Sequence, residues 1–289
     1  MRLRTGLMAT AIASLIGAAS CAPVKILNSI TPSGSFDKTK NISYGPLERQ
    51  KLDIYRSETS RADRPVLVFI HGGSWDHGSK DLYKFLAEGF TSEGFDVVVP
   101  NYRLYPDVIY PKMIEDSAQA VEYAVKQFPD REIVLMGHSA GAYNMLMVGL
   151  APNYLKAAGG DLCRDISGLV SLAGPTGAIK LKEEPYISIF PDRFHSNDAP
   201  INNLIGPRPP LFLAHGSEDE TVHPRNSEDL ADKIIEQGGV ATAKIYEGKN
   251  HTDMVKHISG LFDGDSTLKG DIIQFIENLP EKREGSYCQ

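Results

Sequence analysis

Short apolar runs alternate with amphipathic stretches along most of the chain. Continuous runs rich in β-branched residues are typical of strands covered on both faces, whereas apolar residues every three or four positions are typical of helices. The apolar runs predict strands at residues 65–70, 95–103, 132–137, 166–174, 210–216 and 241–248. The amphipathic stretches predict helices near residues 80–92, 113–128, 140–150, 225–237 and 267–278. Strands that alternate with helices predict an α/β fold, with a mostly parallel central sheet and helices on both faces.

The remaining stretches define the limits of this fold. Residues 41–57 contain two short strand-like runs around Gly45-Pro46, which brings the predicted sheet to about eight strands. We therefore expect one large domain over residues 41–281, followed by a short tail at 282–289. Residues 175–209 form an irregular stretch that is too long for a plain connection in a compact domain, and this predicts a small cap segment.

Composition and charge narrow the class of protein. The 289 residues are 42% apolar and 23% charged, which is ordinary for a globular protein with a large core. The formal net charge is −7 at pH 7, and no stripe of basic residues interrupts it. Nucleic-acid binding relies on clustered Lys and Arg, so we expect no nucleic-acid partner.

The N-terminal segment has the layout of an export signal. The residues MRLRTGLMATAIASLIGAASC begin with two arginines, continue with an uncharged apolar stretch and end with small residues. This order predicts a signal peptide at residues 1–20, and the apolar stretch is too short and too rich in alanine for a good membrane span. A buried N-terminal helix is the alternative. Residues 21–40 carry Pro, Ser, Gly and Lys without periodicity, and we expect them to form a tether.

Cys21 adds a second signal. The sequence AASC resembles the lipobox of bacterial lipoproteins, although Ala18 stands where that pattern usually has leucine. The resemblance implies a lipid on Cys21, and cleavage with secretion is the alternative. Either way we expect export to the cell envelope or beyond, with membrane attachment only through that lipid. In such a compartment Cys163 and Cys288 either form a disulfide or remain free thiols.

Polar residues follow four of the predicted strands. In open α/β sheets, ligands bind outside the carboxyl ends of the strands. The segments found there are His71-Gly72-Gly73-Ser74-Trp75, Gly137-His138-Ser139-Ala140-Gly141, His215-Gly216-Ser217-Glu218-Asp219 and Lys249-Asn250-His251. A serine, an acid and a histidine thus appear in the chain order of a Ser-Asp-His nucleophilic site.

Three of these motifs carry a resemblance to a known family. The chain resembles serine esterases of the α/β-hydrolase fold, of the carboxylesterase and lipase type, over roughly residues 48–280. HGGSW is similar to the H-G-G-x-W oxyanion motif of kynurenine formamidases and of feruloyl-esterase-like bacterial carboxylesterases. NYRLYP is similar to the segment after the next strand in hormone-sensitive-lipase-like enzymes, and GHSAG matches the G-x-S-x-G nucleophile turn.

The resemblance implies a role for each motif. Ser139 would be the nucleophile, His251 the general base and Asp219 the acid that orients the histidine, with Glu218 and Glu220 as competing acids. The oxyanion would be bound by backbone N–H groups of Ala140 and of the Gly72-Gly73-Ser74 turn. We expect Trp75 to pack at the mouth of the site rather than contact substrate.

These roles predict a serine-dependent carboxylic-ester hydrolase acting on a small-molecule ester, without a cofactor. There is no H-E-x-x-H motif and no Cys/His pair with zinc spacing, so we expect no metal site. One alternative is an arylformamidase or other amidase of the same fold, suggested by HGGSW. Another is a binding protein that keeps the fold without catalysis. The natural substrate and the oligomeric state do not follow from the sequence.

Overall fold

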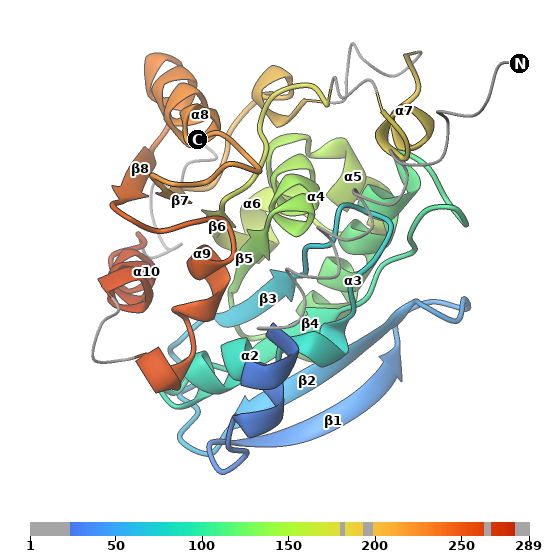
Figure 1. Cartoon of the computed structure of the whole chain (residues 1–289). Coiled ribbons are helices and arrows are strands. Elements are labelled where there is room, and N and C mark those ends of the chain that lie inside the picture. Colours follow the sequence, from blue (N-terminus) through green and yellow to red (C-terminus); the bar gives the residue numbers. More distant parts are fainter. Residues whose placement is uncertain (1–23, 180–182, 193–198, 263–266, 281–289) are drawn as a thin grey trace, which may run out of the picture.

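A twisted eight-stranded sheet forms the centre of the molecule (Figure 1). The computed structural model describes residues 24–179, 183–192, 199–262 and 267–280. The strands are β1 (Phe36–Ser43), β2 (Lys51–Ser57), β3 (Val66–Ile70), β4 (Val97–Pro100), β5 (Ile133–His138), β6 (Ile166–Leu172), β7 (Leu211–Gly216) and β8 (Ala241–Tyr246). Their order in the sheet is β1-β2-β4-β3-β5-β6-β7-β8. β2 pairs antiparallel with β1 and β4, and every other pairing is parallel, so the predicted mostly parallel sheet is confirmed.

Helices cover both faces of the sheet. The α-helices with bounds in the described residues are α2 (Lys84–Thr91), α3 (Lys112–Gln127), α4 (Ala140–Leu150), α5 (Asn153–Ala158), α6 (Leu162–Asp165), α7 (Tyr186–Ile189), α8 (Arg225–Glu236), α9 (Asp253–Lys256) and α10 (Thr267–Glu277). Three short 3₁₀ helices are η1 (Lys80–Leu82), η3 (Pro200–Asn202) and η4 (Gly260–Phe262). All five helices expected from the sequence are present, whereas the short helices α5, α6, α7 and α9 were not predicted.

Two hydrophobic cores hold the layers together, one on each face. Alternate side chains of β3 enter opposite cores: Val66, Val68 and Ile70 belong to the core that includes residues of α3, α4 and α8, and Leu67 and Phe69 belong to the core that includes residues of α2, α9 and α10. All five residues are buried because the central strand is covered on both sides. This explains why the sequence of β3 is continuously apolar rather than alternating.

The segment before β2 corrects one expectation. Residues 24–30 are helical and β1 begins at Phe36, so the tether expected over residues 21–40 is wrong for residues 24–40. Leu27 is buried in the core on the α2 side, and Asn28 bonds to the carbonyl oxygen of Asp81 at 2.8 Å. β1 is an edge strand in which Asp37 and Lys40 are exposed, and its composition therefore resembles that of a linker.

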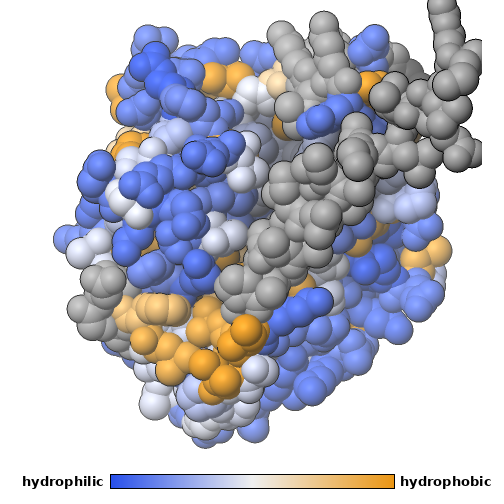
Figure 2. All heavy atoms as spheres, in the orientation of Figure 1, coloured by the Kyte–Doolittle hydropathy of each residue, from blue (hydrophilic) through white to orange (hydrophobic). Residues whose placement is uncertain are grey.

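Several expectations concern residues outside the described ranges. They are the signal peptide at 1–20, the lipid on Cys21 and the tail at 282–289. Cys163 is disulfide-bonded, and Cys288, the partner considered in the sequence, lies outside those ranges. Among the described residues, no helix combines the length and apolarity needed to cross a bilayer. The face in Figure 2 is largely hydrophilic, with a hydrophobic patch near the 24–30 helix and η4, where Ile26, Ile30 and Leu261 are exposed.

Candidate active site

The serine of GHSAG lies on a sharp turn between β5 and α4. Ser139 has φ 54° and ψ −125°, a conformation that is strained for any residue with a Cβ. The flanking glycines permit this turn because there is no room for side chains. A Cβ on Gly141 would lie 2.1 Å from the carbonyl oxygen of Ile70, and one on Gly137 would lie 2.5 Å from that of Gly141. The turn therefore presents Ser139 at the carboxyl edge of the sheet.

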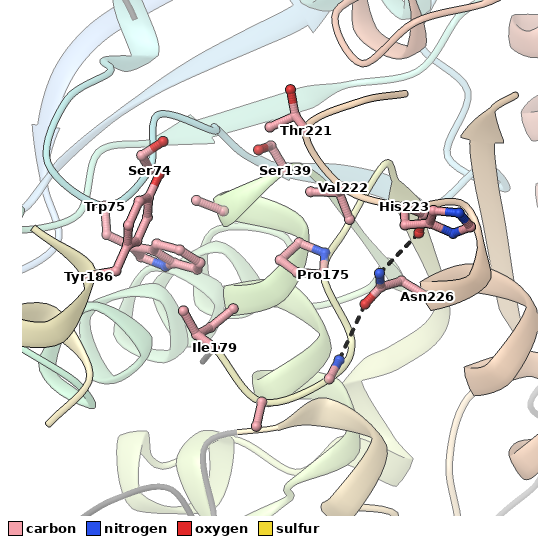
Figure 3. A pocket seen from close by; sticks show the side chains of 13 residues that line it. Ser74, Trp75, Ser139, Pro175, Ile179, Tyr186, Thr221, Val222, His223 and Asn226 are labelled. Atoms are coloured by element: carbon pink, nitrogen blue, oxygen red, sulfur yellow. Dashed lines mark hydrogen bonds between the residues drawn. The ribbon is translucent and has the colours of Figure 1, made fainter. Parts of the chain in front are cut away.

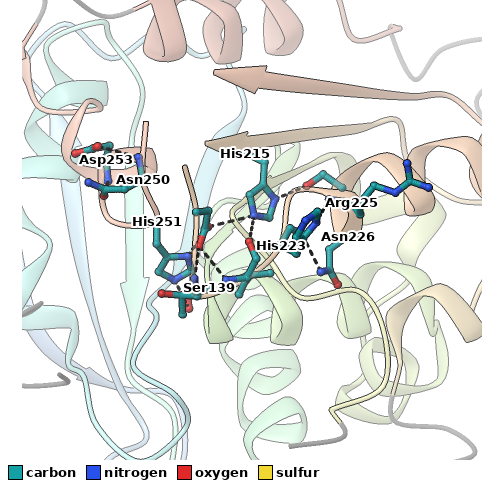
Figure 4. A network of polar contacts seen from close by, with 12 residues as sticks. Ser139, His215, His223, Arg225, Asn226, Asn250, His251 and Asp253 are labelled. Carbon is teal, nitrogen blue, oxygen red and sulfur yellow. Dashed lines mark hydrogen bonds and ion pairs between the residues drawn. The ribbon is translucent and has the colours of Figure 1, made fainter. Parts of the chain in front are cut away.

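Three side chains from distant parts of the sequence form a continuous hydrogen-bond chain (Figure 4). Ser139 Oγ lies 2.8 Å from His251 Nε2, and His251 Nδ1 lies 2.7 Å from Asp219 Oδ2. The three residues follow β5, β7 and β8, whose carboxyl ends meet at one edge of the sheet. Because a carboxylate only accepts, Nδ1 carries the proton and Nε2 accepts from the Ser139 hydroxyl.

Asp219 is held as an anion by four donors. Its Oδ1 accepts from the backbone N–H groups of Thr221 and Val222, each at 2.9 Å, and its Oδ2 lies near His251 and, at 3.2 Å, His215 Nε2. Burial raises the pKa of Asp219, but the hydrogen bonds from His215 and His251 outweigh it and hold that pKa well below its usual range.

The neighbouring acids take no part in this arrangement. The side chains of Glu218 and Glu220 are exposed, whereas Asp219 is 5% exposed and faces His251. Of the three acids considered in the sequence, the structure thus brings only Asp219 to the histidine.

The turn after β3 packs against the serine turn. A Cβ on Gly72 would lie 3.2 Å from the Cβ of Ser139 and 3.0 Å from the carbonyl oxygen of His138. The chain then passes through Gly73, Ser74 and Trp75 with φ values of 124°, 48° and 62°. Only glycine adopts the first without strain, and a Cβ there would also lie 2.2 Å from the carbonyl oxygen of His77.

Ala140 supplies a free backbone donor beside the same serine. It is the first residue of α4, and N–H groups in the first helical turn have no acceptor within the helix. The structure therefore gathers Ser74 and Ala140 with Ser139 around one cavity and places Gly72 directly behind it.

The cavity at Ser139 has a volume of about 360 Å³ (Figure 3). This size suits a small-molecule ligand. The lining residues are Ser74, Trp75, Ser139, Ala140, Pro175, Gly177, Ala178, Ile179, Tyr186, Thr221, Val222, His223 and Asn226. Five of these residues, Pro175, Gly177, Ala178, Ile179 and Tyr186, belong to the stretch predicted as a cap, and they line the cavity together with residues 221–223 and Asn226.

Trp75 joins the cavity wall to the core. Its side chain is 3% exposed, and its Nε1 donates to Asn144 Oδ1 at 2.9 Å. The ring edges contact Tyr143 at 5.2 Å and Phe190 at 4.8 Å between centroids. Trp75 therefore packs as expected and also borders the cavity. Phe190 anchors the cap segment to this aromatic cluster.

Two residues near the site were not identified from the sequence. His215 contacts Asp219, and Asn226 Oδ1 accepts from the backbone N–H of Thr176 at 3.0 Å, which ties the cap segment to α8. His215 lies at the carboxyl end of β7, in the His215–Asp219 segment noted in the sequence, and that position was a usable signal. Within the described ranges, no group of three His, Cys, Asp or Glu residues is placed to hold a metal ion.

The sheet order and the Ser139–His251–Asp219 geometry define a protein of the α/β-hydrolase class. Comparison with known families makes this specific. Residues 52–234 match the BD-FAE model, and the chain belongs to the BD-FAE family of α/β-hydrolase esterases.

Solved structures share the fold. Esterase B from Lactobacillus rhamnosis is 18% identical with a TM-score of 0.77, and the match covers 93% of this chain and 95% of that one. A truncated carbohydrate esterase from gut microbiota is 18% identical with a TM-score of 0.73, over 86% of this chain and 98% of the other.

Curated relatives are also similar in sequence. A probable isoprenylcysteine alpha-carbonyl methylesterase of Arabidopsis thaliana is 26% identical over 244 residues, 74% of this chain and 51% of its own length. This chain therefore spans about half the length of that relative. A kynurenine formamidase of Danio rerio is 26% identical over 82% of this chain and 81% of its own.

Proposed function

We propose that this protein hydrolyses small-molecule carboxylic esters through an acyl-enzyme formed on Ser139. The observation that carries the proposal is the hydrogen-bond chain from Asp219 through His251 to Ser139, which ends in a cavity of about 360 Å³. Family membership and the relatives named as esterases support the same chemistry.

The first half of the reaction forms the acyl-enzyme. Ser139 Oγ attacks the carbonyl carbon of the ester while its proton passes to His251 Nε2. Asp219, an anion in the resting site, stabilises the imidazolium that results and fixes which nitrogen holds the proton. The carbon–oxygen ester bond then breaks, and the leaving alkoxide takes the proton from His251.

The second half regenerates the serine. A water molecule gives a proton to His251 Nε2 as its oxygen attacks the acyl carbon. The bond to Ser139 Oγ then breaks, and Oγ recovers the proton from His251. The products are one carboxylic acid and one alcohol, so atoms and charge balance without a cofactor.

Backbone N–H groups would stabilise the oxyanion in both halves. We assign this role to Ala140 and to the Gly72-Gly73-Ser74 turn, because both border Ser139. Donors fixed in the backbone need little reorganisation as charge develops, and the loss of one typically lowers turnover about 10²–10³-fold.

A formamidase is the second candidate, and a specific observation favours it. The kynurenine formamidase relative matches over about four fifths of both chains, whereas the plant methylesterase is matched over only half of its length. The same residues would serve, with an amine in place of the alcohol as the leaving group.

One experiment tests the proposal and separates the candidates. Purified protein and the Ser139→Ala variant are assayed with p-nitrophenyl acetate and butyrate and, in parallel, with N-formylkynurenine. We expect ester turnover by the wild type and its near-complete loss in the variant. Equal turnover by both proteins would refute the assignment of Ser139. Turnover of the formamide alone would favour the amidase, and no turnover of any substrate would favour a binding protein.

We also propose that the protein is exported and anchored through Cys21. The basic start, apolar centre and AASC sequence of the first 21 residues support this. Mass spectrometry of the mature N-terminus tests it. A lipid-sized mass increase on Cys21 is expected, and an unmodified N-terminus there would refute the anchor.

A further inference from the structure

A buried histidine that the proposed mechanism does not use lies directly behind the acid of the site. His215 is the penultimate residue of β7 and is fully buried. Its Nε2 lies 2.7 Å from the carbonyl oxygen of Val222 and 3.2 Å from Asp219 Oδ2, and its Nδ1 lies 2.8 Å from Ser227 Oγ (Figure 4). Both ring nitrogens are therefore engaged.

These contacts fix which nitrogen carries the proton. A backbone carbonyl oxygen only accepts, so Nε2 of His215 must donate. This N–H donates to the Val222 carbonyl oxygen at 2.7 Å, and Oδ2 of Asp219 lies 3.2 Å from the same nitrogen. In the neutral ring, Nδ1 then accepts from the Ser227 hydroxyl, and Ser227 is itself fully buried on α8. The imidazole is thus held in one orientation by α8 while it faces the acid.

The buried position of His215 in β7 indicates that the role of its imidazole is to form hydrogen bonds. The preceding residues of β7, Leu213 and Ala214, are apolar and fully buried. A polar ring at such a position costs free energy unless its nitrogens are paired. Both nitrogens are paired, and the carboxylate that accepts a hydrogen bond from His251 Nδ1–H also lies beside His215 Nε2.

We propose that His215 is a positioning residue of the active site, an inference that rests on the proposed function. Its Nε2 lies 3.2 Å from the same carboxylate oxygen that accepts from His251, and it restrains the Asp219 carboxylate together with the backbone N–H groups that hold Oδ1. The same N–H holds the Val222 carbonyl and closes the turn of residues 219–222 that lines the cavity. Removing the donor would leave the Asp219 carboxylate with the two backbone N–H groups on Oδ1 and His251 as the single donor on Oδ2, so Oδ2 would be held less firmly toward His251.

Three variants test the role of the donor. His215→Leu removes it, His215→Gln replaces Nε2 with an amide nitrogen, and Ser227→Ala removes only the anchor on the other side of the ring. The readouts are the rate at which a fluorophosphonate probe labels Ser139, kcat and KM for p-nitrophenyl butyrate, and the thermal unfolding midpoint. Labelling depends on activation of the serine and needs no knowledge of the natural substrate.

We expect His215→Leu to lower the labelling rate and kcat together by about 10- to 100-fold, with little change in KM. This is the effect of losing one hydrogen bond to a charged group. His215→Gln should recover most of this loss, and Ser227→Ala should stay within about threefold of wild type. A folded His215→Leu protein labelled at the wild-type rate would overturn the inference.

The other possible results also test the role of His215. If His215→Leu does not fold, His215→Gln is compared with Ser227→Ala instead. A large loss of labelling rate in His215→Gln, at an unchanged unfolding midpoint, would refute the donor role. Absence of probe labelling in the wild type would overturn the proposed function and this inference with it. Labelling of the wild type with no effect of His215 would overturn this inference alone.

Discussion

The imidazole Nε2 of His138 lies 3.0 Å from the backbone carbonyl oxygen of His251 and donates a hydrogen bond to it. The residue immediately before the proposed nucleophile thus holds the loop that carries the proposed base. The two rings also lie against each other, with centroids 4.9 Å apart. The position of His251 relative to Ser139 therefore depends on β5 as well as on β8.

Burial of His138 and His71 should make stability depend on pH. Burial, the largest cause, lowers the pKa of His138 to about 3 and that of His71 to about 4, from a usual value of 6.5. Between pH 6.5 and 4 the unfolded chain binds protons that the folded chain does not, so the free energy of unfolding falls as the pH falls. The limiting slope is about 1.4 kcal/mol per pH unit for each histidine.

Urea unfolding at several pH values between 4.5 and 7.5 measures this slope. His138→Gln should reduce it by about the contribution of one proton. The exposed His223 provides the control, and His223→Gln should keep the wild-type slope. An unchanged slope in the His138→Gln variant would show that His138 is protonated in the folded state.

Neutralising Asp219 should have a much larger effect than neutralising its neighbour. Asp219→Asn would no longer stabilise the protonated His251 and would favour the wrong tautomer, so kcat should fall by about 10⁴-fold, as in other sites of this type. Glu218→Gln changes the same charge at an exposed side chain and should leave kcat near that of wild type. Comparable losses in the two variants would reassign the acid. Steady-state kinetics on p-nitrophenyl butyrate are sufficient.

The glycine after the proposed nucleophile should not tolerate even a methyl group. Gly141→Ala places a Cβ 2.1 Å from the Ile70 carbonyl oxygen and 2.4 Å from that of His71, both backbone atoms of the neighbouring strand and turn. We expect destabilisation of about 2 kcal/mol or more and loss of ester turnover.

Gly270 is the matched control. It is exposed within α10, and a Cβ built there meets no atom within 4 Å. Gly270→Ala should stabilise the protein by about 0.5–1 kcal/mol because alanine favours the helix. Chemical denaturation of both variants gives the comparison, and equal stabilities would contradict the close packing of the turn.

Replacing Trp75, which borders the cavity, with phenylalanine should lower the free energy of unfolding. The change removes the N–H that donates to Asn144 Oδ1, and Asn144 is fully buried, so its oxygen is left without this donor. We expect a loss of about 1–3 kcal/mol in the free energy of unfolding. Stability within 0.5 kcal/mol of wild type, roughly the effect of a neutral surface change, would show that the hydrogen bond contributes little.

The parts of the fold that the sequence predicted are those whose local pattern matches their tertiary environment. β3 is buried on both faces, so its apolar run is continuous, and α3 buries one face against the sheet, so its pattern is amphipathic. The end of β1 falls within the predicted 41–57 strands, but its residues 36–40 were missed because this is an edge strand with exposed Asp37 and Lys40, and such a composition is equally typical of a linker.

In the candidate site, too, some features follow from the local sequence and others depend on tertiary packing. The strained turn at Ser139 was predictable because Gly137 and Gly141 are required on either side of it. The contact between His215 and Asp219 was not predictable, since it depends on the turn of residues 219–222 folding back over the end of β7. The helix α7 in the cap segment is likewise held by packing of Phe190 on the aromatic cluster rather than by its own four residues.

The hydrogen bond between Ser139 and His251 joins residues 112 positions apart, and the histidine follows β8, an edge strand in which Tyr246 alone among six residues is buried. Ser139 follows β5, whose residues are all buried. Edge segments of this kind open at a lower free energy than the centre of a sheet. On gentle heating the hydrolytic activity should therefore disappear while most of the near-UV circular dichroism persists, so that inactivation reports the local opening of the C-terminal edge rather than melting of the whole domain.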